Sequence, residues 1–290
     1  MRSTRRRLAV PAMVLVFAVL AATACHGDPA AVPPASRAQV RSVAPTEGDD
    51  AAQRWTGQRT VPLSSAGSPT ATGGQPAAVG ALFYTDSDGA LTHHCTASVL
   101  HSPNADVVLT AAHCIHDGYG GDYVPGLVFV PGYRDGASPY GVWVPTRTIV
   151  APGWQQSGDP NLDVGFLVVR QPGSDHRIED VTGANTLGVD QGFEHRVTVT
   201  GYPSESDEPV TCAGESSRQN DSQLSFQCPD YTNGTSGAPW VADADPRTGS
   251  GTVVGVIGGY EEGGVDPDVS YSPYFGQDVK SLYDKAVAAS

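Results

Sequence analysis

The feature that most constrains the fold is a pattern that begins at Ala77 and continues almost to the C-terminus. Short apolar and β-branched runs alternate there with Gly, Pro, Asp and Asn residues, and each run has the length of a strand. Many short strands separated by turns, in a chain with 34 glycines, are typical of β-barrels and β-sandwiches. The expected strands are residues 79–84, 107–110, 127–130, 142–150, 164–169, 197–201 and 253–257.

The C-terminal tail has a different pattern. Across residues 277–289, Val279, Leu282, Tyr283 and Val287 recur at three- and four-residue intervals, which predicts a helix. We therefore expect residues 77–290 to form an all-β domain closed by a C-terminal helix. Its length of about 215 residues fits one large domain or two small barrels, and the pattern alone does not choose between them.

The first 25 residues have the layout of an export signal. Four arginines between Arg2 and Arg7 precede an apolar run, which is followed by small residues. A membrane span needs roughly 20 apolar residues; this run is shorter and contains Pro11, so a cleaved signal is favoured over a permanent anchor. The arginines serve the general export route and weakly resemble a twin-arginine signal, and both routes stay open. Either route predicts a secreted protein.

Cys25 follows the small residues, at the position where bacterial lipoprotein signals place the cysteine that is lipidated. Ala22 stands where such signals usually have a larger aliphatic residue, so both lipidation of Cys25 and its loss with the signal stay open. Lipidation would anchor the protein to the outer face of the cell membrane. Residues 26–76 are rich in Ala, Pro, Ser, Thr and Gly and are predicted to be a disordered linker or a propeptide, with Arg54 and Trp55 as a docking point.

The charge balance argues against nucleic acid as a partner. Without the four signal arginines, 13 basic residues face 31 acidic ones, a net charge of about −18.

Four cysteines remain after Cys25, namely Cys95, Cys114, Cys212 and Cys228, and they suit disulfides in an oxidising compartment. Three connectivities are open, of which sequential pairing is the simplest. The chain contains no CxxC pair, which disfavours a structural zinc site, and we expect no metal.

Three segments carry the residues of a nucleophilic hydrolase: LTAAHC ending at Cys114, NLDVGFL around Asp163, and NGTSGAP around Ser236. They resemble the histidine, aspartate and serine segments of the chymotrypsin/trypsin family, and the order His, Asp, Ser is that of the family. The likeness is closest to the secreted bacterial branch, which includes glutamyl-endopeptidase-like enzymes. It implies two orthogonal six-stranded β-barrels, with His113 and Asp163 on the first, Ser236 on the second, and the active cleft between them.

The resemblance also implies a mechanism. A serine hydroxyl is a weak nucleophile, so Ser236 needs the imidazole of His113 to take its proton, and Asp163 would hold His113 in the correct tautomer. The backbone N–H groups of Gly234 and Ser236 would form the oxyanion hole. No cofactor is required. In this family the cysteine after the histidine often pairs with one on the preceding strand, which implies Cys95–Cys114 and leaves Cys212–Cys228 to staple a loop near the specificity pocket.

Several positions depart from the trypsin pattern. Thr235 stands where trypsins have the aspartate that pairs with a new N-terminus, so activation by that ion pair is not supported. Asp230 stands where trypsins bind a substrate Arg or Lys, yet it is equally compatible with a solvated turn. Gly258 and Tyr260 lie in a segment that resembles the pocket-lining strand, and Ile257 replaces the histidine expected for a strict glutamate preference.

The sequence therefore predicts a monomeric, secreted serine endopeptidase acting on protein or peptide substrates. Two alternatives stay open. One is a non-catalytic binding protein with the protease fold, and the other is a serine esterase or related hydrolase at the cell envelope.

Overall fold

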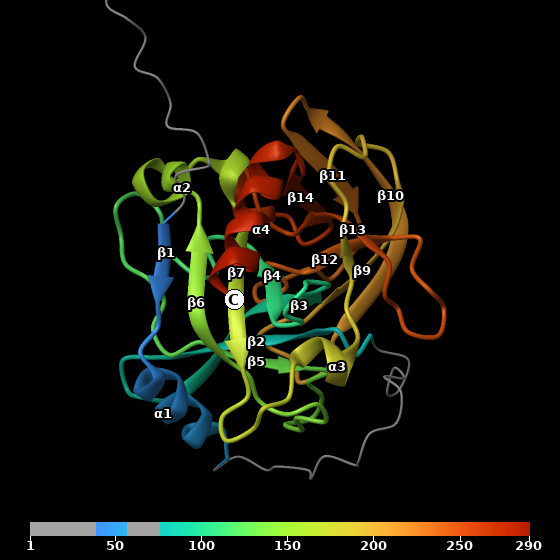
Figure 1. The fold of residues 1–290 in the computed structure, drawn as a ribbon. Helices are drawn as coiled ribbons and strands as arrows, with labels where there is room; N and C mark the ends of the chain where they lie inside the picture. Colours follow the sequence, from blue (N-terminus) through green and yellow to red (C-terminus); the bar gives the residue numbers. More distant parts are fainter. Residues whose placement is uncertain (1–38, 57–75) are drawn as a thin grey trace, which may run out of the picture. The chain divides into compact units, whose positions relative to one another are not determined.

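The computed structural model describes residues 39–56 and 76–290, and its β-strands form two seven-stranded sheets. The first sheet has the strand order β1-β6-β7-β4-β3-β2-β5 (Figure 1). Its strands are β1 (Gln39–Ser42), β2 (Val79–Thr85), β3 (Leu91–Leu100), β4 (Val107–Thr110), β5 (Val128–Pro131), β6 (Val144–Val150) and β7 (Gly165–Arg170). All neighbours in this sheet are antiparallel.

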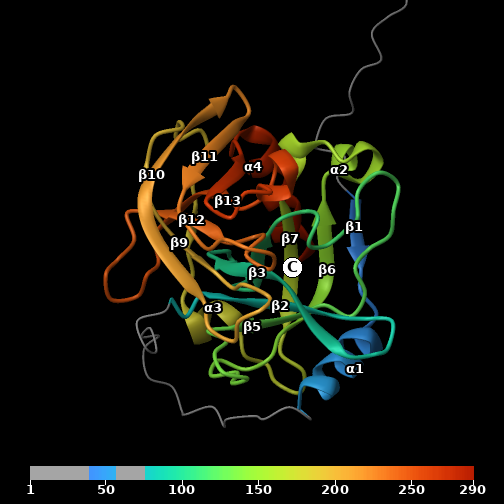
Figure 2. The same cartoon turned by 180° about the vertical axis from the view of Figure 1, so that it is seen from behind.

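The second sheet has the order β14-β11-β10-β9-β12-β13-β8, and Figure 2 shows its long strand β10 from behind. Its strands are β8 (Thr186–Leu187), β9 (Arg196–Gly201), β10 (Val210–Asn220), β11 (Gln223–Gln227), β12 (Pro239–Ala242), β13 (Thr252–Val256) and β14 (Val269–Pro273). Each sheet thus has one strand more than the six expected. Among the strands that were not predicted are β1, from the N-terminal segment, and β8, which pairs in parallel with β13 through two residues.

The helices are short except at the two ends of the described chain. They are α1 (Pro45–Thr56), α2 (Pro152–Ser157), η3 (Pro160–Leu162), α3 (Ile178–Thr182), η4 (Tyr260–Gly263) and α4 (Gln277–Ala289). The C-terminal helix predicted from the 3.6-residue pattern is confirmed as α4, whose Val279 and Leu282 are buried in one core cluster with Ile149 and Phe166 of the first sheet. None of the helices in the described ranges is long and apolar enough to cross a membrane.

The N-terminal segment differs from the expectation of disorder over 26–76. Residues 39–56 are ordered because they extend the first sheet: β1 pairs with the outer edge of β6, and α1, which follows β1, also contacts β6. Trp55 is only 2% exposed. Its ring lies 4.8 Å from that of Phe83 and 5.8 Å from that of Tyr133, centroid to centroid. The buried Trp55 ring and the pairing of β1 therefore stabilise this segment although it contains few apolar residues. Residues 1–38, with the predicted signal and Cys25, and residues 57–75 lie outside the described ranges.

Candidate active site

Strand pairing in the first sheet brings His113 and Asp163 together. Strands β4 and β7 are antiparallel, and the last residue of β4, Thr110, lies opposite the first residue of β7, Gly165. His113 follows Thr110 by three residues and Asp163 precedes Gly165 by two, so both side chains arise at the same end of the same strand pair.

The carboxylate of Asp163 is fully buried and accepts three N–H groups. Oδ1 accepts from the backbone N–H of His113 at 2.9 Å. Oδ2 accepts from Nδ1 of His113 and from the backbone N–H of Gly259, each at 2.8 Å. This arrangement makes Nδ1 the protonated nitrogen of the neutral imidazole and leaves Nε2 free to accept a proton.

The environment of His113 favours its protonated form. Burial lowers the pKa of the imidazole, but the charge and hydrogen bond of Asp163, helped by the charge of Glu262, raise it by more, so the pKa lies above its usual value. His94, the neighbouring histidine on β3, shows the opposite: burial, followed by the charges of His113 and His93, lowers its pKa to about 4. Of these two histidines, His94 is therefore neutral, and His113 is the one that accepts a proton more readily.

Ser236 lies on the loop before β12, and that loop is held against the first sheet. The backbone N–H of Thr96 in β3 donates to the Ser236 carbonyl at 2.7 Å, and Oγ1 of Thr96 donates to the Gly234 carbonyl at 3.0 Å. Gly237 has a φ of 84°, and an added Cβ there would overlap Oγ1 of Thr110 and the Thr96 carbonyl oxygen. The serine loop is thus seated on the two strands β3 and β4, the second of which leads to His113.

Two backbone donors near Ser236 are unused. Within the described part of the chain, neither the N–H of Gly234 nor that of Ser236 donates a hydrogen bond. Gly234 has a φ of 93°, and an added Cβ would come within 2.5 Å of the Ser204 nitrogen and 2.8 Å of the Tyr202 carbonyl oxygen. Only glycine fits this backbone position, and the arrangement leaves two N–H groups for an incoming acceptor.

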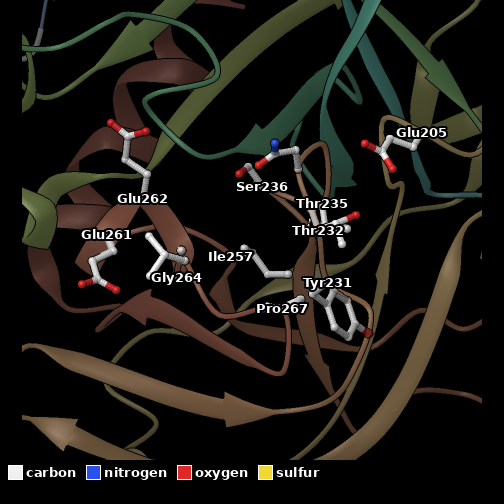
Figure 3. A pocket seen from close by; sticks show the side chains of 13 residues that line it. Glu205, Tyr231, Thr232, Thr235, Ser236, Ile257, Glu261, Glu262, Gly264 and Pro267 are labelled. Carbon is white, nitrogen blue, oxygen red and sulfur yellow. Dashed lines mark hydrogen bonds between the residues drawn. The ribbon is translucent and has the colours of Figure 1, made fainter.

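A pocket of about 560 Å³ opens beside Ser236 (Figure 3). Glu261 and Glu262 lie on one side of it and Glu205 on the other, with the Ile257 side chain between them. The lining residues are Glu205, Tyr231, Thr232, Asn233, Thr235, Ser236, Ile257, Glu261, Glu262, Gly263, Gly264, Val265 and Pro267. They include three carboxylates and no lysine, arginine or histidine, so the pocket is negatively charged.

The three residues predicted to bind substrate do not line this pocket. Asp230 is exposed on a turn with a φ of 69°. Gly258 faces Asp163 instead, and an added Cβ would lie 3.0 Å from the Asp163 carbonyl oxygen and 3.1 Å from its Oδ2. Tyr260 is 46% exposed, and its ring packs edge-on against Tyr271 at 5.1 Å between centroids.

The pocket glutamates were missed by the sequence interpretation. Glu261 and Glu262 directly follow the segment that was singled out as pocket-lining, so a signal for them was present. Glu205 comes from a distant part of the chain and had no such signal.

Both predicted disulfides form. Cys95–Cys114 ties β3 to the residue after His113, and Cys212–Cys228 ties β10 to the residue after β11. The sulfurs of Cys95 and Cys114 and a ring nitrogen of His113 lie within 4.8 Å of one another. Because both sulfurs are in a disulfide, this cluster offers no thiolate to a metal ion.

The two sheets and the C-terminal helix define a chymotrypsin-like fold, in which His113 and Asp163 lie together at one end of the strand pair β4–β7 and the Ser236 loop is held on β3 and β4. A trypsin-like peptidase domain is recognised over residues 95–256, which is more than half of the chain. The chain therefore belongs to the trypsin-like peptidase family and is a serine endopeptidase.

Solved structures of bacterial proteases agree with this assignment. The thermostable serine protease AL20, from an extremophilic microorganism, is 27% identical with a TM-score of 0.66, covering 74% of this chain and 99% of that one. The protease Anisep from Arthrobacter nicotinovorans is 25% identical with a TM-score of 0.65, covering 76% and 99%. A Glu endopeptidase, 15% identical with a TM-score of 0.58 over 86% of this chain and 96% of that one, shares the fold. No curated protein matches the sequence.

Proposed function

We propose that the protein is an exported, monomeric serine endopeptidase in which Ser236 is the nucleophile, His113 the general base and Asp163 the residue that orients His113. The observation that carries the proposal is the buried Asp163 carboxylate, which accepts both the ring and backbone N–H groups of His113. Such a carboxylate fixes the tautomer and stabilises the imidazolium that forms during the reaction.

The reaction follows from these roles. Oγ of Ser236 attacks the carbonyl carbon of the scissile peptide bond while Nε2 of His113 takes the hydroxyl proton. The negative oxygen of the tetrahedral intermediate would accept from the free N–H groups of Gly234 and Ser236, each typically worth about 3 kcal/mol in the barrier. The C–N bond then breaks, His113 gives its proton to the leaving amine, and an acyl-enzyme remains. Water, deprotonated by His113, hydrolyses the ester and the proton returns to Ser236.

Export is supported by the arginine-rich, apolar N-terminus and by the two disulfides, because disulfides persist mainly in oxidising compartments. Mass spectrometry of the exported protein tests this part. A mature N-terminus at a lipid-modified Cys25 would establish anchoring, whereas an unmodified terminus after Cys25 would establish free secretion. A mature chain that keeps the first 25 residues would overturn the signal assignment.

The pocket beside Ser236 supports a preference for a positively charged substrate side chain. Its three carboxylates come from opposite walls, and no cationic side chain among the lining residues competes for them. Asp230, which was the sequence candidate for this role, is outside the pocket. We propose that Glu205, Glu261 and Glu262 together favour Arg or Lys at the position before the cleaved bond.

Labelling with an organophosphate tests the catalytic assignment. The folded protein should be modified at Ser236 and nowhere else, and Ser236→Ala should be unlabelled and inactive. A folded wild-type protein that resists labelling would instead support the non-catalytic alternative. Matched ester and amide substrates with the same acyl group separate an endopeptidase, which cleaves both, from an esterase, which cleaves only the ester.

A peptide-library cleavage profile tests the substrate preference. Glu261→Gln combined with Glu262→Gln should weaken the selection of Arg and Lys over uncharged residues. Asp230→Asn is the control, because it removes one carboxylate charge from an exposed turn outside the pocket. A wild-type profile without a basic preference, or one changed only by Asp230→Asn, contradicts the pocket assignment.

A further inference from the structure

Gln223 is a buried amide at the start of β11, in the second sheet, and it is 2% exposed. A buried polar side chain of this size must find hydrogen-bond partners or destabilise the fold. Its neighbours along β11 pair with β10 and β14 through the backbone, so the side chain itself is not needed for the sheet ladder.

The Gln223 amide bridges two segments outside its own sheet. Nε2 donates to the Pro160 carbonyl oxygen at 3.1 Å and to Oδ1 of Asn161 at 3.0 Å, both in η3. Oε1 accepts from the backbone N–H of Tyr260, the first residue of η4, at 3.2 Å. Both N–H groups and the carbonyl oxygen of one amide are therefore in use.

These two segments are the ones that hold Asp163. Asn161 precedes Asp163 by two residues, and Tyr260 follows Gly259, whose N–H donates to Oδ2 of Asp163. Gly259 also lies so close to the amide that an added Cβ would overlap Oε1 of Gln223. The same η4 segment continues into Glu261 and Glu262, which line the pocket.

We propose that Gln223 is a positioning residue that fixes η3 against η4, and thereby holds Asp163 on His113 and sets the pocket wall that carries Glu261 and Glu262. The proposal rests on the proposed function, in which Asp163 orients His113. In this proposal one side chain of the second sheet connects the pocket wall that carries Glu261 and Glu262 with the carboxylate of Asp163.

Removing the Gln223 amide should leave the protein folded. Pro160, Asn161 and Tyr260 are all exposed residues, so water can replace their hydrogen bonds to Gln223 if the amide is removed. Methionine matches glutamine in length and fills a similar volume without those bonds. Gln223→Met should therefore stay folded while η3 and η4 lose their fixed separation.

Two variants and one control test the proposal. Gln223→Met removes all three hydrogen bonds. Gln223→Glu keeps an acceptor for the Tyr260 N–H but places a carboxylate against the two acceptor oxygens of η3. It therefore removes only the hydrogen bonds to η3. Gln227→Met makes the same chemical change at the exposed end of the same strand and should leave activity unchanged.

Organophosphate titration of each variant first gives the fraction of folded active sites. Per active site, kcat should fall by about 10- to 100-fold in Gln223→Met, the range expected when a catalytic group is displaced by about 1 Å. The preference for Arg and Lys should weaken in the same variant, because Glu261 and Glu262 are no longer held. Wild-type kcat and wild-type selectivity per active site would overturn the proposal.

The ionisation of His113 supplies a readout that does not require turnover. The charged and titratable groups that act on it are Asp163, Glu262 and His94. Displacing Asp163 should move the His113 titration, followed by NMR, to lower pH in Gln223→Met but not in Gln227→Met. An unchanged His113 titration in Gln223→Met overturns the proposal, even if that variant is inactive. A shifted titration, together with a wild-type protein whose Ser236 resists labelling, overturns only the proposed function.

Discussion

Replacing Asp163 by Asn has a consequence that follows from the donors around the carboxylate. Two of the three donors are backbone N–H groups, from His113 and Gly259, and they cannot become acceptors. An asparagine has one acceptor oxygen and one NH₂ group. Whichever way the amide turns, its NH₂ group must face a backbone N–H.

The two orientations disable the site in different ways. With the amide oxygen at the Oδ2 position, the Nδ1–H and Gly259 bonds survive, but the imidazolium loses its neutralising charge. With the oxygen at the Oδ1 position, the NH₂ group faces Nδ1 and selects the wrong tautomer of His113. We expect kcat to fall by about 10⁴-fold, equivalent to about 5.5 kcal/mol of transition-state stabilisation. One buried N–H is left unpaired in either case, which costs about 1 to 3 kcal/mol of the free energy of unfolding.

The contribution of His113 to the pH dependence of stability should also change sign. In the wild type, the raised pKa of His113 means that its protonation stabilises the fold below an unfolded pKa of about 6.5, and this contribution is lost as the pH rises through the folded pKa. In Asp163→Asn, burial is opposed mainly by Glu262, so the folded pKa falls below 6.5. The variant should then lose stability as the pH falls through that region, because the unfolded chain binds the proton more readily.

The measurements are single-turnover kinetics and urea unfolding at about pH 5 and about pH 9. Asp159→Asn is the matched control, because it changes the same group four residues away, where the carboxylate accepts, among the described residues, a single hydrogen bond from the Asn161 backbone N–H. Asp163→Asn retaining more than about one hundredth of the wild-type kcat would refute the assigned role. If Asp163→Asn loses no more stability relative to the wild type at about pH 5 than at about pH 9, the electrostatic reasoning is refuted.

Two further predictions concern stability. Trp55→Ala should lower the free energy of unfolding by about 3 to 5 kcal/mol in urea, because the ring is buried against Phe83 and Tyr133; a loss below about 1 kcal/mol would show that α1 is dispensable. Removing either disulfide by paired Cys→Ala changes should cost about 3 kcal/mol, since the separations of 19 and 16 residues are similar. Only loss of Cys95–Cys114 should also lower kcat, because Cys114 adjoins His113; equal kinetic effects would contradict this.

The sequence indicated seven strands that are rich in apolar and β-branched residues, and it missed polar strands such as β10 for a physical reason. All seven predicted runs correspond to strands, namely β2, β4, β5, β6, β7, β9 and β13. Strand β10 contains few apolar residues and is mostly exposed, and it forms because β9 and β11 pair with it from both sides. Strand β3 was not predicted because the polar residues His93, His94 and Thr96 interrupt its apolar pattern. Thr96 is fully buried because the serine loop binds to it, a contact that no local pattern can indicate.

The residues of the site were predictable to the extent that each lies in a local motif. His113 and Asp163 come together as expected because both flank paired core strands. The pocket was not predictable, since its walls combine Glu205 with residues far along the chain and depend on Glu261 and Glu262 adopting φ values of 52° and 55°. Non-glycine residues rarely take this conformation, so a sequence pattern gives no reason to expect it. Gln223 is a similar case, because only the folded structure places its amide between η3 and η4.

The pairing of β1 with β6 would limit the distance between the enzyme and the membrane in a lipidated form. If Cys25 carries a lipid, only the 14 residues up to Gln39 separate the anchor from the first sheet. Fully extended, they reach at most about 50 Å, compared with about 180 Å if all of residues 26–76 served as a tether. A lipidated form would therefore cleave substrates only in a thin layer next to the bilayer.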